Sequence, residues 1–244
     1  MTTIKWFNIN IPIDIKEFSQ KLKSANFTKE AEEGFLLKNV TSNEVVGRYI
    51  EYKPFTKEFK NPFGVSETIT IPDFAVVEFK FTIQDGRWLL EVYNTPRSIK
   101  SFTNKISEFV GFGFYIAEIK LDLKNYIDEI ESHLGKLVIK KMELYNINIE
   151  NTALGQMLIK GEKDIRKSLE SHLISQTHYK ISSFKAFFYQ NDILTGGFEV
   201  KENSRLEIFD MPVQVFLQQY NTVFMSVLKN LRNTLLFSNL ILIV

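Results

Sequence analysis

The chain contains no cysteine, and this absence removes whole classes of chemistry. Disulfide bonds, thiolate nucleophiles and metal centres held by cysteine all require that residue. The sequence also lacks an excess of either charge, because 30 basic residues face 29 acidic ones and leave a net charge of +1. Domains that coat nucleic acid usually carry a clear basic excess, so contact with nucleic acid would require a local basic patch.

Long apolar runs are missing as well. A helix that crosses a membrane needs roughly 18 or more consecutive apolar residues, and the most apolar stretch, residues 235–244, is too short. Residues 1–10 alternate as a strand does and lack the basic-then-apolar order of a secretory leader. We therefore expect a cytoplasmic protein with no integral membrane span.

Motifs that cradle phosphate or activate a nucleophile are also absent. There is no Walker A string and no Gly-x-Ser-x-Gly elbow. The pair Gly111 and Gly113 lacks the third glycine of a dinucleotide loop. The three histidines, His133, His172 and His178, do not have the spacing of a helical metal pair. The sequence predicts no cofactor and favours a protein without catalytic activity.

Apolar residues are present in sufficient number for a core. They make up 44% of the 244 residues, and charged residues make up 24%, which is ordinary for globular chains. The 22 phenylalanines are unusual, and we expect many of them to fill that core. The length suits one large domain or two small ones, and no linker rich in Gly, Ser or Pro is found between them.

The first half predicts strands and hairpins with single helices between them. Asp14 is placed to cap a helix, with Glu17 three residues later as in a capping box. A second helix is expected to begin at Thr95 and Pro96, and a third covers 126–134. The predicted strands and hairpin lie over residues 4–11, 35–40, 45–52, 76–92 and 114–123.

Residues 53–65 form the least regular segment of this half. Phenylalanines at positions 55, 59 and 63 alternate with Pro54, Pro62 and Gly64. A loop that carries apolar rings at every fourth position needs a surface to bury them. Either the rings pack onto the core of the protein, or the loop docks on a partner.

The second half repeats the pattern, with strands over 137–149 and 156–159, a helix over 162–175, and strands over 179–189 and 198–209. If the chain holds two domains, they join near Gly135 and comprise residues 1–135 and 136–244. Hairpins interleaved with single helices are typical of α+β proteins. The sequence predicts an α+β fold of mostly antiparallel sheets with a long C-terminal amphipathic helix.

One string resembles a metal-dependent nuclease site. Pro72-Asp73 followed by Glu78-Phe79-Lys80 matches a pattern in which two acids hold a divalent ion and a lysine stabilises charge. However, Asp73 and Glu78 are only five positions apart on one predicted strand, and an odd separation places them on opposite faces. A hydrolase that uses Asp73, Glu78 and Lys80 is therefore an alternative to the main interpretation.

Basic residues gather loosely in three places, of which the helix after Pro96 is the best candidate for contact with nucleic acid. It carries Arg97, Lys100 and Lys105. The other two clusters lie around 136–141 and 160–167, and the last also contains acids. For that cluster the sequence favours an ordinary face of ion pairs.

The C-terminal segment from Pro212 predicts a long helix with an apolar seam. Apolar residues recur at alternating spacings of three and four, as in a coiled coil. An exposed apolar patch of this size needs cover. Either the helix lies on the sheet and its tail completes the core, or the helix, over 213–237, forms an interface with a second copy or another protein. Shallow contact with a membrane is a third alternative. We favour the interface. The predicted interface residues are Leu217, Tyr220, Phe224, Val227, Leu231 and Leu235.

These observations favour a non-catalytic binding or assembly protein that forms a homo-oligomer or binds a protein partner. An accessory subunit of a prokaryotic or phage nucleic-acid or antiviral defence system would fit the AT-rich style of the sequence. The two alternatives are the metal-dependent hydrolase and a nucleic-acid-binding module that uses a local basic patch.

Overall fold

The computed structural model describes residues 2–84, 86–134, 136–150, 153–171, 178–190 and 193–210. Of the described residues, 54% lie in strands and 19% in helices, and the strands pair antiparallel. The α+β prediction is therefore wrong, since this part of the chain is mostly antiparallel β-sheet with four short helices. The predicted long helix over 213–237 lies outside the described residues. No described helix has the length and apolar character to cross a bilayer.

The chain divides into two compact units. One unit comprises residues 4–117, and the other comprises residues 1–3 together with 118–244. The sequence had suggested a joint near Gly135 between two halves of the chain. The two compact units divide between Ala117 and Glu118, at the last residue of β8 (Tyr115–Glu118), and the joint near Gly135 stays a prediction.

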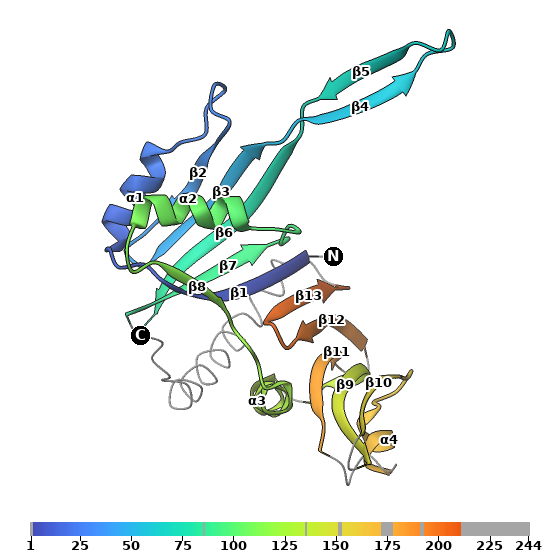
Figure 1. Ribbon diagram of the computed structural model, residues 1–244. Helices are drawn as coiled ribbons and strands as arrows, with labels where there is room; N and C mark the ends of the chain where they lie inside the picture. The colour runs from blue at the N-terminus through green and yellow to red at the C-terminus, as the bar shows by residue number, and fades with distance from the viewer. Residues whose placement is uncertain are drawn as a thin grey trace. The chain divides into compact units, whose positions relative to one another are not determined.

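The unit of residues 4–117 is built on one antiparallel sheet with the strand order β1-β7-β6-β3-β2 (Figure 1). The register between β3 and β6 is regular along its whole length, from Glu44 opposite Thr82 to Tyr52 opposite Phe74. The strands predicted over 4–11, 35–40 and 45–52 and the hairpin over 76–92 are confirmed. The strand bounds are β1 Thr2–Asn10, β2 Glu33–Val40, β3 Glu44–Tyr52, β6 Phe74–Gln84 and β7 Arg87–Tyr93.

Two helices, α1 (Ile15–Ser24) and α2 (Lys100–Val110), cover one face of this sheet. Alternate residues of the strands point toward them, because side chains on a strand alternate between faces. The rings of Phe18 on α1 and Phe102 on α2 contact that of Phe81 on β6. The core of this unit is therefore rich in phenylalanine, as the composition had suggested.

The start of each helix has a local cause. The Glu17 N–H donates to Asp14 Oδ1 at 2.8 Å, so the predicted cap of α1 is confirmed. The predicted start of the second helix at Thr95 is wrong, since α2 begins at Lys100. The Thr95 hydroxyl instead donates to the Val92 carbonyl oxygen at 3.3 Å.

The second unit holds a run of antiparallel strands in the order β10-β9-β11-β12-β13, and we call this run the second sheet. Helix α3 (Leu123–Leu134) packs against it through Tyr126 and Ile130, both fully buried. It begins three residues earlier than predicted, because Asp122 Oδ1 accepts the N–H of Lys124. The strand bounds are β9 Val138–Glu150, β10 Ala153–Lys160, β11 Lys180–Gln190, β12 Ile193–Lys201 and β13 Arg205–Phe209.

Three expectations about element length need correction. The strand predicted over 114–123 is only β8, and α4 begins at Arg166 and not at 162. The segment predicted to be irregular over 53–65 contains strand β4 (Phe55–Lys60), which forms a hairpin with strand β5 (Ser66–Ile71). Strands β4 and β5 add strand content that the sequence did not predict.

Candidate functional site

Strands β4 and β5 form a two-stranded ribbon that projects from the sheet of the first unit, beyond α1 and α2 (Figure 1). The ribbon continues the β3–β6 ladder in the same register. Tyr52 lies opposite Phe74, the Lys53 N–H donates to the Asp73 carbonyl oxygen at 2.8 Å, and Phe55 lies opposite Ile71. It is therefore an extension of one hairpin of the sheet and not a separate loop.

Two prolines mark the base of the ribbon. Because the register is continuous, Pro54 lies opposite Pro72. In an antiparallel ladder the hydrogen-bonded pairs alternate with pairs whose N–H groups point outward. The bond from Lys53 to Asp73 fixes residues 53 and 73 as a hydrogen-bonded pair. The prolines thus occupy positions where a missing N–H costs the ladder nothing.

A tight turn closes the tip. The Asn61 side chain accepts the N–H groups of Phe63 and Val65 at 3.0 and 3.1 Å. Gly64 adopts a φ of 81°, a left-handed conformation that glycine tolerates best. The turn at the tip therefore fixes the register in which β4 and β5 pair.

The ribbon is amphipathic. Residues directly opposite each other share a face, so the register sorts the side chains into two sets. One face carries four apolar side chains and one charge of each sign: Phe55, Lys57, Phe59, Glu67, Ile69 and Ile71. The other face is polar and consists of Thr56, Glu58, Lys60, Ser66, Thr68 and Thr70.

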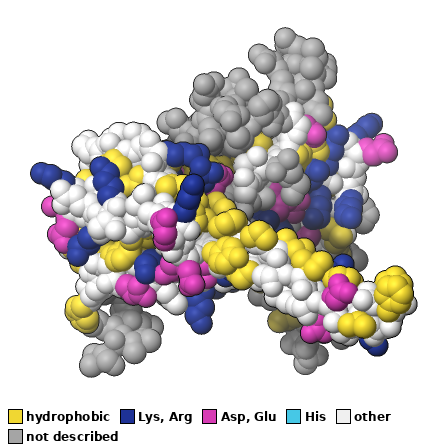
Figure 2. Space-filling model, turned by 90° about the horizontal axis from the view of Figure 1, so that it is seen from above, with side chains coloured by type: hydrophobic (Ala, Val, Ile, Leu, Met, Phe, Trp, Pro, Cys, Tyr) yellow, Lys and Arg dark blue, Asp and Glu magenta, His cyan; other side chains and the backbone are white. Residues whose placement is uncertain are grey.

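The apolar face of the ribbon has no cover. Every residue of β4 and β5 is exposed, and Phe55, Ile69 and Ile71 retain 55%, 51% and 47% exposure. Figure 2 shows hydrophobic side chains gathered along this arm. By parity, this face continues the row that includes Tyr49 and Phe79, which α1 and α2 bury further along the same ladder. This row of side chains therefore stays apolar in the ribbon, beyond the part of the ladder that α1 and α2 bury.

The ribbon carries no net charge, because Lys57 and Lys60 balance Glu58 and Glu67. Its Lys57 makes no ion pair with any described residue, and Glu67 Oε1 accepts the Asn61 amide at 2.6 Å. A phosphate backbone would call for a basic surface. The arm instead offers apolar area and strand edges, which are features that bind protein.

The structure does not bring Asp73, Glu78 and Lys80 together as a metal site. Asp73 precedes β6 and accepts the N–H of Phe74, whereas Glu78 lies five positions further, roughly 16 Å along a strand. Lys80 Nζ lies 3.0 Å from Glu44 Oε2, in an ordinary ion pair between neighbouring strands. Within the described residues, no three acidic or histidine side chains are grouped to hold a metal ion.

The predicted basic cluster on the second helix is partly neutralised. Lys105 Nζ lies 2.8 Å from Glu33 and 3.4 Å from Glu108. Hydrogen bonds from Lys105 and from the Tyr49 hydroxyl lower the pKa of Glu33 below its ordinary value. Arg97 and Lys100 are exposed, Arg97 before α2 and Lys100 at its first residue.

The predicted interface residues Leu217, Tyr220, Phe224, Val227, Leu231 and Leu235 lie outside the described residues, as does His172.

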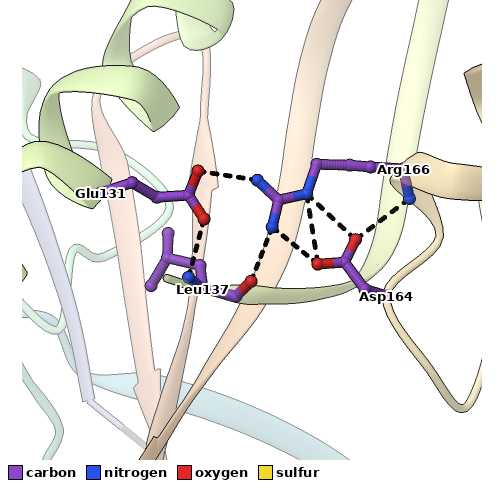
Figure 3. A network of polar contacts seen from close by, with 4 residues as sticks. All are labelled: Glu131, Leu137, Asp164 and Arg166. Atoms are coloured by element: carbon purple, nitrogen blue, oxygen red, sulfur yellow. Dashed lines mark hydrogen bonds and ion pairs between the residues drawn. The ribbon is translucent and has the colours of Figure 1, made fainter. Parts of the chain in front are cut away.

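A polar network holds the second unit together at the start of α4 (Figure 3). The Arg166 guanidinium donates to Glu131 of α3 at 2.8 Å, to the Leu137 carbonyl oxygen at 2.7 Å and to Asp164 at 2.6 Å. Burial would raise the pKa of Asp164, but its hydrogen bonds with Arg166 outweigh burial and lower it. The expected face of ion pairs is confirmed for Arg166, and we assign it a structural role because each of its three guanidinium nitrogens donates a hydrogen bond within the network.

The outer face of the second sheet combines lysines with aromatic rings. Lys185 Nζ lies 3.9 Å from the Phe209 ring centroid, and Lys140 Nζ lies 5.0 Å from that of Phe187. The two rings meet across Gly197, where a Cβ atom would come within 2.4 Å of Phe209. These contacts are cation–π interactions, which stabilise a sheet and can also accompany base stacking.

Sequence reasoning recognised the phenylalanines at 55, 59 and 63 but missed Ile69 and Ile71. A signal was present in the sequence, since Thr68-Ile69-Thr70-Ile71 alternates as a strand does. The placement of Pro54 and Pro72 at equal distances from the Asn61-to-Val65 turn also indicates a hairpin.

Neither a protein-family model nor a curated protein sequence matches this chain.

Proposed function

We propose that the protein is a non-catalytic binding or assembly protein that contacts a protein partner through the β4–β5 ribbon. The observation that carries this proposal is the uncovered apolar face of the ribbon, which places Phe55, Phe59, Ile69 and Ile71 in water. A solvated apolar row of this kind lowers solubility unless a partner covers it. The regular register and the turn at the tip fix the backbone of the ribbon, so little backbone ordering is needed when a partner binds.

The two faces of one strand supply the test. A photo-crosslinking residue at position 69 lies on the apolar face, and the same residue at 68 lies on the polar face. In the full-length protein, purified and in extract from its source cells, we expect protein adducts at 69 and few at 68. Positions 59 and 58 give a second matched pair. Equal yields on the two faces, or no adducts at all, would refute the proposal.

A second candidate function is binding of single-stranded nucleic acid on the outer face of the second sheet. It is favoured by Lys185 and Lys140, which lie over the rings of Phe209 and Phe187 and pair with no acid among the described residues. We expect such binding to weaken steeply with salt. The test is titration of a labelled single strand at two salt concentrations with Lys185→Glu, against Lys167→Glu on α4 as the control.

A further inference from the structure

The charges on the apolar face of the ribbon point to the identity of the partner. The apolar face carries one lysine, Lys57, and one glutamate, Glu67, among its apolar side chains. The two residues lie on neighbouring rungs of this face, since Lys57 is opposite Ile69 and Glu67 is opposite Phe59, two positions further along. A face with one charge of each sign is complementary to a second copy of itself.

A two-fold axis perpendicular to the ribbon, midway between the rungs of Lys57 and Phe59, makes this complementarity concrete. It stacks the apolar faces of two ribbons in opposite directions, so that the sheets with their helices α1 and α2 lie at opposite ends. Lys57 of each copy then lies over Phe59 of the other and next to Glu67 of the other. One patch thereby covers itself, which is the common solution for homodimers.

Building on the proposed function, we infer that the protein forms a two-fold homodimer in which two β4–β5 ribbons stack by their apolar faces. The net charge of +1 presents no barrier, because two nearly neutral copies do not repel each other. The polar faces, with their serine and threonine hydroxyls, remain in water. The stacked pair buries the row that α1 and α2 leave uncovered.

The ribbon is short, and this sets the expected affinity. Its strands of six residues make a face roughly 20 Å long and roughly 10 Å wide. This area of about 200 Å² is small beside the roughly 800 Å² per partner of a standard stable interface. We therefore expect a dissociation constant on the order of micromolar to tens of micromolar. Sedimentation is therefore measured over a range of protein concentrations. The highest concentration is about a hundred times the lowest concentration that can be detected, so that both monomer and dimer are populated.

A charge exchange tests the inference on the full-length protein by analytical ultracentrifugation. Lys57→Glu and Glu67→Lys each create two like-charge contacts in the symmetric dimer, so we expect each to weaken dimerisation about tenfold or more. The double variant restores both opposite-charge contacts, and we expect its dissociation constant to return to within about threefold of the wild-type value. Because these side chains are exposed, circular dichroism should show no change in fold.

Matched controls lie on the polar face of the same strands. Glu58→Lys and Lys60→Glu change the same kinds of charge two or three residues away and should leave the mass distribution unchanged. A double variant that fails to recover would overturn the stacked dimer, as would single variants that dimerise like the wild type.

The homodimer and the proposed function fail in different ways. If the wild type stays monomeric at every concentration while crosslinking at position 69 captures another protein, the homodimer is wrong and the binding role of the ribbon stands. If the wild type is monomeric and the two faces crosslink alike, both are wrong.

Discussion

Glu91 illustrates how a single residue makes stability depend on pH. Its carboxyl group is 1% exposed on β7 and accepts the Tyr93 hydroxyl at 2.9 Å. Burial raises the pKa of Glu91 above its ordinary value of 4.5, and the nearby Lys80 offsets only part of this effect. The folded state therefore holds the proton more tightly than the unfolded state does.

The sign of the effect follows from linkage. A raised pKa contributes stability below about pH 4.5 that is lost as the pH rises through the pKa in the folded protein. We expect Glu91→Gln to raise the free energy of unfolding at pH 7, because the glutamine oxygen can still accept the Tyr93 hydroxyl without a buried charge. The difference between variant and wild type should shrink as the pH falls, by no more than about 1.4 kcal/mol per pH unit.

Urea denaturation from pH 4 to pH 8 checks this expectation. Glu78→Gln, on the partly exposed side of the neighbouring strand β6, serves as the control. A constant difference between Glu91→Gln and wild type across the pH range would show that Glu91 does not titrate in this window.

At the scale of elements, Arg166 joins three of them. It links the end of α3, the residue before β9 and the start of α4 through bonds to Glu131, Leu137 and Asp164. Lysine presents a single ammonium group and cannot reproduce this planar fork. We expect Arg166→Lys to lower the free energy of unfolding by about 1–3 kcal/mol.

Chemical denaturation measures that loss. Lys167→Arg, at the next position of α4, is the control and should change stability little, because Lys167 is exposed. An Arg166→Lys variant as stable as wild type would mean that solvent replaces the network without cost.

The ribbon is a second element whose removal is informative. Since both of its faces are exposed, the core of the first unit does not rely on it. Replacing residues 54–72 with Asn-Gly joins the hydrogen-bonded pair Lys53 and Asp73 by a two-residue hairpin turn. We expect the free energy of unfolding to change by less than about 1 kcal/mol. Thermal denaturation checks this, and loss of folding would show that the ribbon stabilises the sheet.

The elements also show where sequence reasoning succeeds. The cap at Asp14 and the hairpin over 76–92 depend on neighbours within a few residues, so local patterns predict them. The ribbon was missed because prolines were taken as signs of irregular structure, although Pro54 and Pro72 occupy positions that need no N–H. The Arg166 network could not be predicted, because Glu131 and Arg166 are 35 positions apart.

At the scale of the whole molecule, the near balance of charge determines how association should respond to salt. With a net charge of +1, the copies have little mutual repulsion to screen. An apolar interface gains slightly from salt, and the Lys57–Glu67 contacts lose slightly. We expect the dissociation constant of the homodimer to change less than about threefold when the Debye length falls from about 10 Å to about 3 Å.

Sedimentation at 0.1 and 1 M salt, conditions that correspond roughly to these two Debye lengths, makes the measurement. Weakening by about tenfold or more would point to an interface dominated by charge. The same series separates the second candidate function, because binding of single-stranded nucleic acid should fall by orders of magnitude over this range.

Because the β3–β6 and β4–β5 ladders share one register, the length of the ribbon can change without any change in how its strands pair. Each residue added to both strands lengthens the ribbon by about 3.3 Å. Inserting two residues into each strand keeps the phenylalanine and isoleucine side chains on the face that meets the partner. Inserting one residue into each strand turns the threonine and serine side chains toward the partner instead. Evolution can therefore change how far this arm reaches only in steps of about 6.6 Å if the arm is to keep the same face toward its partner.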